Sequence, residues 1–258
     1  MKQKLQTLVQ SNEPLNYQNH LLKVTIPSGS TFPSMHPGQF VQILVENSPG
    51  TFLRRPISIH FVDEMKNELW LLVQKVGDGT QRICETKPGE TLDIILPLGN
   101  SFSLPEKKNE KLLLIGGGVG IAPMLFLGKK VKENGLEPHF LLGGRSKNDL
   151  LQLDEFQKYG KVHTTTEDGS AGEKGFVTHH SILKNDFDFI YTCGPKPMMM
   201  AVAKFAQERG IECEVSLENL MACGFGACLC CVEKTTRGNV CTCTEGPVFN
   251  IKELTNWV

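Results

Sequence analysis

The sequence has almost no net charge and no long apolar run, and each absence excludes a class of protein. Its 258 residues carry 27 Lys and Arg against 28 Asp and Glu, a formal net charge of −1. This balance argues against nucleic-acid binding through bulk electrostatic attraction. No apolar run approaches the roughly 18 residues that cross a membrane. The first residues, MKQKLQTLVQSNEPL, lack the apolar core of a secretory signal. We therefore expect a cytoplasmic protein with no membrane span and no nucleic-acid partner.

Several catalytic signatures are missing as well. The sequence contains no Ser-His-Asp arrangement, no HExxH motif and no P-loop lysine motif. Its seven histidines show no metal-ligand spacing, so we expect surface or hydrogen-bonded core positions for all of them: His20, His36, His60, His139, His163, His179 and His180. No internal repeat or low-complexity segment is present either.

Cysteine, by contrast, is abundant and unevenly placed. Three of the nine cysteines are scattered, at Cys84, Cys193 and Cys213. The other six crowd between residues 223 and 243, as Cys223, Cys228, Cys230, Cys231, Cys241 and Cys243. Without a secretory signal, such cysteines are more often metal ligands or reactive thiols than disulfides. The last forty or so residues are therefore expected to form a site of their own.

The rhythm of apolar runs predicts two different architectures along the chain. Short β-rich runs punctuated by turns fill residues 1–100 and indicate a barrel or sandwich. A polar linker over 101–110 follows. Strands then alternate with helices expected at 122–134, 148–160 and 196–210, which is typical of a parallel, doubly wound sheet. We expect domains over 1–100 and 101–215, and a small cysteine-rich subdomain over 216–258.

Two glycine-bearing turns follow predicted strands in the second domain. GGGVGIAP (116–123) and YTCGPKPM (191–198) both lie between a strand and a helix. Glycines allow close approach of a phosphate, and ligands bind at the carboxyl edge of parallel sheets. A plain strand-to-helix turn is the alternative for the first, and simple packing is the alternative for Cys193 and the methionines.

Arginines mark a third candidate, in the β-rich half. Arg54-Arg55-Pro56-Ile57-Ser58 offers a guanidinium fork for a pyrophosphate and a hydroxyl for a ring heteroatom, although a surface turn is the alternative. The downstream Gly77-Asp78-Gly79-Thr80 is either a phosphate-binding turn or a hairpin.

The cysteine spacing is the most specific signal. C-x4-C-x2-C followed by a distant cysteine is the plant-type [2Fe–2S] pattern, and a structural Zn(Cys)4 site is the alternative. From spacing alone, Cys230 and Cys241 leave the ligand set open.

In this order, the motifs RPIS, GDGT, GGGVGIAP and CGPKPM resemble the ferredoxin–NADP reductase superfamily, and the similarity covers nearly the whole chain. The segment TEDGSAGEKG (166–175) and the tail MACGFGACLCC…CTEGPVF further resemble the electron-transfer subunits of NAD-dependent, class B dihydroorotate dehydrogenases. The resemblance implies an FAD-binding β-barrel, a doubly wound α/β domain that binds NAD, and a C-terminal [2Fe–2S] subdomain. Ile57 stands where the superfamily usually has tyrosine.

The same resemblance implies individual contacts. FAD would be contacted by Arg55, Pro56, Ile57, Ser58, Leu72, Val73, Gln74, Gly79 and Thr80. The nicotinamide nucleotide would be contacted by Gly116, Gly117, Gly118, Val119, Gly120, Cys193, Gly194, Pro195 and Met198. The cluster would be held by Cys223, Cys228, Cys231 and Cys243, with Cys243 preferred over Cys241 because it precedes Gly-Pro-Val-Phe by three residues.

The implied activity is electron transfer in pyrimidine biosynthesis. Electrons would come from an FMN-containing catalytic subunit that oxidises dihydroorotate, in a heterotetramer of two copies of each chain, and pass through the cluster and FAD to NAD+. The chain itself offers no obvious base for dihydroorotate and no eight-fold βα barrel. The alternatives are a related subunit of a sulfhydrogenase, a sulfite reductase or a ferredoxin:NADP oxidoreductase, and a non-catalytic zinc-bearing docking protein. Arg145 leaves the choice between NAD and NADP open.

Overall fold

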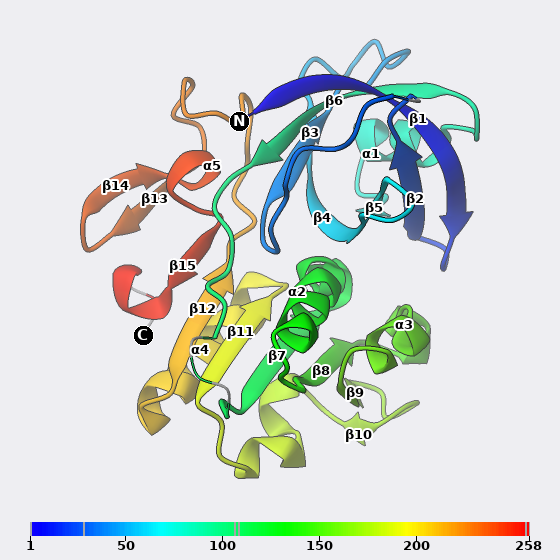
Figure 1. Cartoon of the computed structure of the whole chain (residues 1–258). Helices are drawn as coiled ribbons and strands as arrows, with labels where there is room; N and C mark the ends of the chain where they lie inside the picture. The colour runs from blue at the N-terminus through cyan, green and yellow to red at the C-terminus, as the bar shows by residue number, and fades with distance from the viewer. Residues whose placement is uncertain (1, 28, 106, 108, 256, 258) are drawn as a thin grey trace.

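The computed structural model describes residues 2–27, 29–105, 107, 109–255 and 257, and its N-terminal part is a closed antiparallel barrel. Six strands follow one another around it in the order β1-β2-β5-β4-β3-β6 (Figure 1). Their bounds are β1 Gln3–Pro14, β2 Asn19–Thr25, β3 Phe40–Ile43, β4 Arg55–Asp63, β5 Glu68–Gln74 and β6 Thr91–Leu98. The predicted barrel is confirmed, whereas the long first strand, β1, was not predicted from the sequence.

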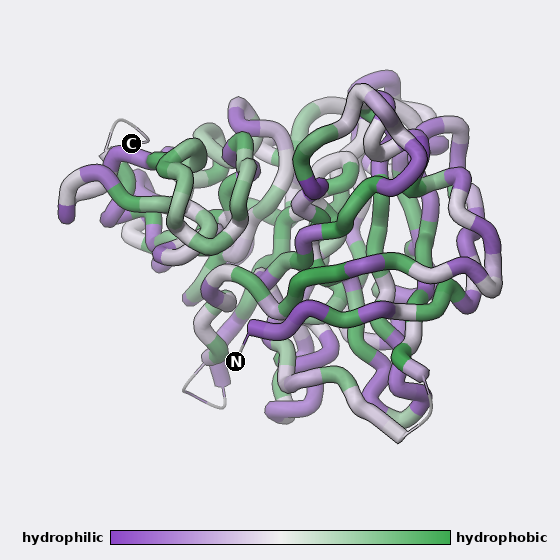
Figure 2. The backbone as a smooth tube through the Cα atoms, turned by 90° about the horizontal axis from the view of Figure 1, so that it is seen from above, coloured by the Kyte–Doolittle hydropathy of each residue, from purple (hydrophilic) through white to green (hydrophobic). Residues whose placement is uncertain are grey.

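Side-chain alternation along the strands builds the barrel core. On β3, Val41 and Ile43 join the core cluster of the barrel, whereas Phe40 packs in a separate cluster with Cys231 and Cys243. Successive side chains of a strand point to opposite faces, so Phe40 and Gln42 share the outer face of β3. Hydrophobic stretches run along the barrel strands in Figure 2, and hydrophilic residues gather in the loops. The outer face of β3 is thereby left for the cysteine-rich segment.

The second domain is the predicted doubly wound sheet. Its seven strands lie in the order β10-β9-β8-β7-β11-β12-β15, and all neighbours are parallel except the last pair. The bounds are β7 Leu112–Gly117, β8 His139–Gly144, β9 Lys161–Thr166, β10 Glu173–Lys174, β11 Phe189–Cys193, β12 Glu212–Ser216 and β15 Val248–Asn250.

Helices cover both faces of this sheet. Their bounds are α2 Ala122–Glu133, α3 Leu153–Gln157 and α4 Lys196–Arg209, with 3-10 turns η1 Gly118–Ile121, η2 Lys147–Asp149, η3 Val177–His179 and η4 Ser181–Lys184. Two predicted helices are confirmed, but the one expected over 148–160 is wrong in extent, because Gln152 adopts a left-handed conformation that delays the helix start. Among the described residues, we find no helix with the length and apolar character needed to traverse a bilayer.

Helix α2 joins the barrel to the sheet (Figure 1). Its Phe126 lies in the barrel core, while Met124 and Leu125 pack with Phe61 and Trp70 of the barrel in a shared cluster. Burial of these side chains between two layers is the main stabilisation of such an interface. The two domains therefore share a continuous core that fixes the space between them.

The cysteine-rich segment packs against both domains. It contains the hairpin β13 Val232–Thr235 and β14 Gly238–Cys241, the short helix α5 Thr242–Glu245, strand β15 and the 3-10 turn η5 Ile251–Glu253. Strand β15 pairs antiparallel with β12, so this segment completes the edge of the α/β sheet. The barrel ends at Leu98 and the sheet begins at Leu112, on either side of the predicted linker.

Candidate functional site

A cleft of about 750 Å³ opens at the carboxyl ends of the parallel strands, where the sheet faces the barrel. The sheet contributes both glycine turns and the segment after β10, and the barrel contributes Gln18, Asn19 and Gln74. Ligands of open α/β sheets bind at this edge because the strand order reverses there and the helix starts converge. The volume is in the range of cofactor and ligand sites.

The two glycine turns interlock at the floor of the cleft. A Cβ added at Gly120 would lie 2.4 Å from Cα of Gly194, and one added at Gly117 would lie 2.4 Å from the sulfur of Met198. Gly194 itself has a φ of 150°, which side-chain-bearing residues rarely adopt. The glycines are therefore required for the contact between the turns, which the structure brings together at one edge of the sheet.

Most of the expected nucleotide residues line this cleft. They are Gly117, Gly118, Val119, Gly120, Gly194, Pro195 and Met198. Gly116 and Cys193 lie behind its wall: Gly116 packs against Ile121, and Cys193 is 1% exposed. Burial raises the pKa of the Cys193 thiol, so this residue is a neutral wall element.

Several residues of the cleft were not predicted from the sequence. Gln18 lies in the β1–β2 turn and Asn19 begins β2, and no local sequence signal marks either residue for this site. Glu218 follows β12 on the same sheet edge. Because ligands of open parallel sheets bind at the carboxyl ends of the strands, its position after a predicted strand was a usable signal. The cleft walls desolvate Glu218 and raise the pKa of its carboxyl, although part of the residue stays exposed. Arg145 also lines the cleft, and its Nη2 lies 3.2 Å from the Tyr17 hydroxyl.

The two adjacent arginines, Arg54 and Arg55, have different environments. Arg54 forms a structural ion pair, in which its Nη2 lies 2.6 Å from Oδ1 of the buried Asp93. The Arg55 side chain instead lies against helix α1 (Asp78–Cys84), and its Nε would be 2.6 Å from a Cβ at Gly79. Arg55 donates to the Leu53 carbonyl at 2.7 Å and keeps further donors for a ligand. GDGT therefore starts a helix beside Arg55 and is not a hairpin turn.

Strands β4 and β5 separate beside Arg55–Ser58. Strand β4 pairs with β3 over Arg55–Ser58 and with β5 only from Ile59 onward, opposite Leu71. The next residues of β5, Leu72 to Gln74, pair with β2 on their other side. Ile57, Leu72 and Val73 have buried side chains, so only their backbones are available to a ligand. The Thr80 hydroxyl already accepts from the Val76 and Gly77 amides.

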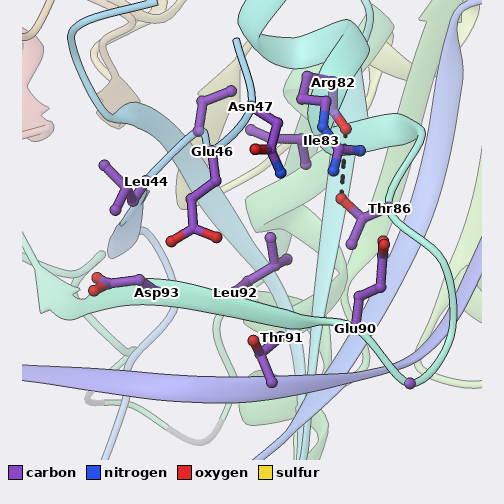
Figure 3. A pocket seen from close by; sticks show the side chains of 12 residues that line it. Leu44, Glu46, Asn47, Arg82, Ile83, Thr86, Glu90, Thr91, Leu92 and Asp93 are labelled. Atoms are coloured by element: carbon purple, nitrogen blue, oxygen red, sulfur yellow. Dashed lines mark hydrogen bonds between the residues drawn. The ribbon is translucent and has the colours of Figure 1, made fainter.

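A second hollow, of about 320 Å³, lies elsewhere on the barrel (Figure 3). The segment after β3, the end of α1 and the start of β6 line it. It carries three carboxylates, Glu46, Glu90 and Asp93, and one cation, Arg82. Carboxylates repel phosphate groups, so a nucleotide is better accommodated by the larger, glycine-lined cleft.

The cysteine loop, residues 223–231, is brought to the distant Cys243 by the β13–β14 hairpin. Val232 pairs with Cys241 across the hairpin, and the amide of Thr242 donates to the Cys231 carbonyl at 2.9 Å. Positive φ angles at Gly224 and Gly226 curl the loop, where glycine is the residue that tolerates them. Cys231 and Cys243 are thereby buried together against Phe40 and Leu98.

Each of the four expected cluster ligands accepts a backbone N–H bond at its sulfur. The donor–acceptor pairs are Phe225 to Cys223, Cys223 to Cys228, Cys243 to Cys231 and Gly226 to Cys243, at 3.1–3.5 Å. Among the described residues, the sulfurs of Cys230 and Cys241 accept no such bond, and Cys230 is exposed. N–H groups directed at sulfur stabilise thiolates and the clusters they bind.

Protonation at the cysteine loop reflects the same contacts. Burial favours the neutral thiol of Cys223, but the N–H bonds from its loop outweigh it and lower the pKa to about 6. Burial and the neighbouring Cys231 raise the pKa of Cys243 to about 12. Among the described residues no three ligating side chains converge on one ion position. A [2Fe–2S] cluster does not require such convergence, because four cysteines are shared between its two irons. The donor set therefore fits the cluster.

Comparisons with known proteins agree with this assembly. Residues 218–255 match the family model of the iron-sulfur cluster binding domain of dihydroorotate dehydrogenase B, and residues 114–204 match the oxidoreductase NAD-binding domain. The iron-sulfur match supersedes the zinc alternative. A solved structure of an NADH-dependent reduced ferredoxin-NADP oxidoreductase, described for flavin-based electron bifurcation, superposes with a TM-score of 0.85 at 29% identity, over 96% of this chain and 89% of that one.

Curated relatives are similar over most of their length. The electron transfer subunit of dihydroorotate dehydrogenase B (NAD(+)) from Shouchella clausii is 40% identical over 84% of this chain and 86% of its own. The subunit of that name from Geobacillus sp. is 36% identical over 98% and 99%. With its barrel, nucleotide cleft and cysteine loop, the chain belongs to the family of electron transfer subunits of NAD+-dependent dihydroorotate dehydrogenase B.

Proposed function

We propose that this chain carries electrons from a dihydroorotate-oxidising, FMN-containing catalytic subunit through a [2Fe–2S] cluster and FAD to NAD+, in pyrimidine biosynthesis. The observation that supports this most strongly is the set of four N–H bonds, one to each expected ligand sulfur, in a loop packed on the barrel strand next to the RPIS motif. A cluster there lies close to the flavin-binding wall.

Each group has its own residues in the proposed arrangement. Bound FAD would exchange hydride with the nicotinamide and single electrons with the cluster, which is the chemistry of those cofactors. Arg55 would pair with the FAD pyrophosphate, with Pro56, Ile57, Ser58, Leu72, Val73, Gln74, Gly79 and Thr80 forming the remaining wall. The two glycine turns would hold the nicotinamide nucleotide. Cys223, Cys228, Cys231 and Cys243 would bind the cluster, and Cys230 and Cys241 would remain free thiols.

The domain limits of the proposal follow this division. We propose an FAD-binding domain over 1–100, an NAD-binding domain over 101–215 and a cluster-binding subdomain over 216–258. The cluster-binding subdomain contributes β15 to the sheet of the NAD-binding domain, so the two are joined by strand pairing.

The partner would dock beside the cysteine loop. Leu220, Phe225 and Leu229 are 86%, 50% and 66% exposed there, and apolar side chains gathered on a surface often mark an interface. We propose a cytoplasmic heterotetramer with two copies of each chain.

The decisive experiment separates this chain from its partner. With FAD and cluster bound, the chain alone should reduce an artificial dye with NADH, because both nucleotide sites lie within it. It should not reduce NAD+ with dihydroorotate until the catalytic subunit is added. Dihydroorotate turnover by the chain alone would overturn the division of labour. Absence of dye reduction in a flavin-replete sample would overturn the assignment of the cleft.

The similarity to a solved NADH-dependent reduced ferredoxin-NADP oxidoreductase supports one competing function, a ferredoxin:NADP oxidoreductase subunit. The identities of 36–40% with electron transfer subunits of dihydroorotate dehydrogenase B favour the dihydroorotate-dependent function proposed above. Assaying the purified native complex with dihydroorotate and with reduced ferredoxin as alternative electron donors distinguishes the two functions, because each function uses a different donor.

A further inference from the structure

Gln42 carries a buried side-chain amide on the outer face of β3. Its side chain is 0% exposed, and neither Nε2 nor Oε1 has a hydrogen-bond partner among the described residues. Buried side-chain amides are nearly always satisfied, so an unpartnered one calls for an explanation, such as a group bound beside it. The backbone of Gln42, by contrast, is engaged: it pairs with β4 and β6 in the sheet, and its carbonyl also accepts from Arg54.

The amide lies directly against the cysteine loop. A Cβ at the buried Gly224 would lie 2.8 Å from Nε2 and Cγ of Gln42. Gly224 follows the ligand Cys223, and its φ of 78° turns the loop at this contact. The next outward-facing residue on the same strand, Phe40, packs with Cys231 and Cys243. Gln42 is therefore part of the barrel surface on which the cysteine loop is seated.

Gln42 also adjoins the flavin motif. It pairs across β3 and β4 with Pro56, and its carbonyl binds Arg54, which precedes Arg55. A single residue thus contacts the cysteine loop through its side chain and the flavin-bearing strand through its backbone. Such a location is suited to setting the cluster's electronic environment on the flavin-facing side.

We infer that the Nε2–H of Gln42 donates a hydrogen bond to a sulfur atom of the bound [2Fe–2S] cluster, and that Gln42 is a positioning residue for electron transfer. The inference rests on the proposed cluster. An N–H donor stabilises the reduced cluster, whose sulfurs carry more negative charge, and therefore raises the reduction potential.

Gln42→Met tests this in the full chain with FAD and cluster bound, because methionine keeps the length of the side chain and removes the donor. We expect the cluster to remain at full iron content and to become harder to reduce. At a fixed potential the reduced fraction relative to oxidised should fall about threefold to tenfold, and tenfold corresponds to about 59 mV for one electron. Gln39→Met is the matched control, because the Gln39 amide is already bonded to His36 and Gly99.

A second measurement does not depend on the variant folding. In the wild-type chain carrying 15N in its glutamine side-chain amides, pulsed electron paramagnetic resonance of the reduced cluster should detect coupling to one such nitrogen. Coupling in the wild type, or a lowered potential in Gln42→Met with Gln39→Met unchanged, supports the inference. An intact cluster with no coupling and an unchanged potential overturns it. A wild-type chain with no [2Fe–2S] signal would instead overturn the proposed function.

Discussion

At the scale of single residues, neighbours with the same chemistry have different roles. Arg54 is paired with the buried Asp93, whereas Arg55 lies against α1 and donates to the Leu53 carbonyl. Likewise, Cys243 is fully buried with an N–H bond to its sulfur, whereas Cys241, two residues earlier, is half-buried and paired in a hairpin. Under the proposed function, the environment and not the residue type distinguishes the functional member of each pair.

This contrast predicts the outcome of replacing the six clustered cysteines by serine, one at a time. Cys223, Cys228, Cys231 and Cys243 variants should lose most of their iron and visible absorbance, because serine is a poor substitute for a thiolate ligand. Cys230 and Cys241 variants should keep both and serve as the matched controls. The measurement is iron per chain after anaerobic reconstitution. Loss of the cluster in Cys241→Ser and its retention in Cys243→Ser would show the ligand set to be wrong.

At the scale of elements, strands β8 and β9 and the segment before β11 bring three histidines together. His139 Nδ1 lies 3.1 Å from His163 Nε2 with their rings stacked, and the His163 and His180 ring centroids are 5.7 Å apart. Burial lowers the pKa of all three, and Lys161 lowers those of His139 and His163 further, while Glu137 and Glu173 oppose this. The rings are therefore neutral in the folded chain at neutral pH.

These three histidines predict that acid destabilises this part of the sheet. Because the folded pKa values lie below the unfolded value near 6.5, the unfolded chain binds more protons below that pH, and stability falls as the pH drops. In urea unfolding, the midpoint should fall between pH 7.5 and 5.5 more steeply for the wild type than for His163→Gln. The slope is the informative quantity, since the variant also loses packing at every pH. Equal slopes would exclude a role for the His163 ring.

At the scale of the whole molecule, the interface between barrel and sheet decides whether the sites face each other. Apolar packing around α2 provides most of it, and the buried His60 adds bonds to the Ala122 carbonyl and to Gln152. At its edge, Glu64 of the β4–β5 turn binds Lys129 at 2.5 Å and Lys130 at 3.0 Å on α2. This ion pair joins the two domains at the surface.

Glu64→Gln should lower the free energy of unfolding by about 0.5–1 kcal/mol at pH 7, since the ion pair is partly exposed. Desolvation opposes ionisation of Glu64, but the two lysines outweigh it and lower its pKa from 4.5 to about 2. The contribution is thus present above pH 4.5 and is lost as the pH falls toward 2. Urea unfolding at pH 7 and pH 4, with and without salt, measures it. Glu208→Gln, which removes an exposed pair within α4, is the control. A difference that persists in high salt would contradict an electrostatic origin.

Local sequence was sufficient for those features that depend on neighbouring residues. Short apolar runs predicted a barrel or a sandwich, and the family resemblance chose the barrel. The strand–helix rhythm predicted the doubly wound sheet, and the glycine turns and the cysteine spacing predicted the sites. These patterns follow from strand and helix periodicity, from the freedom of glycine and from the ligand spacing of a cluster. The strand β1, with its mixed polar composition, and the interruption at Gln152 lacked such a local signal.

Tertiary structure alone decided the contacts between segments distant in the chain. Gln42 and Gly224, His139 and His180, and Glu64 and Lys129 are each brought together by packing of different elements. So are the barrel residues Gln18 and Asn19 in the nucleotide cleft. No local pattern encodes these pairs, because a side chain's spacing within its own strand or helix does not specify which other element covers it. The sequence determined the chemistry carried by each motif, and the packing of barrel, sheet and cysteine loop determined which residues complete it.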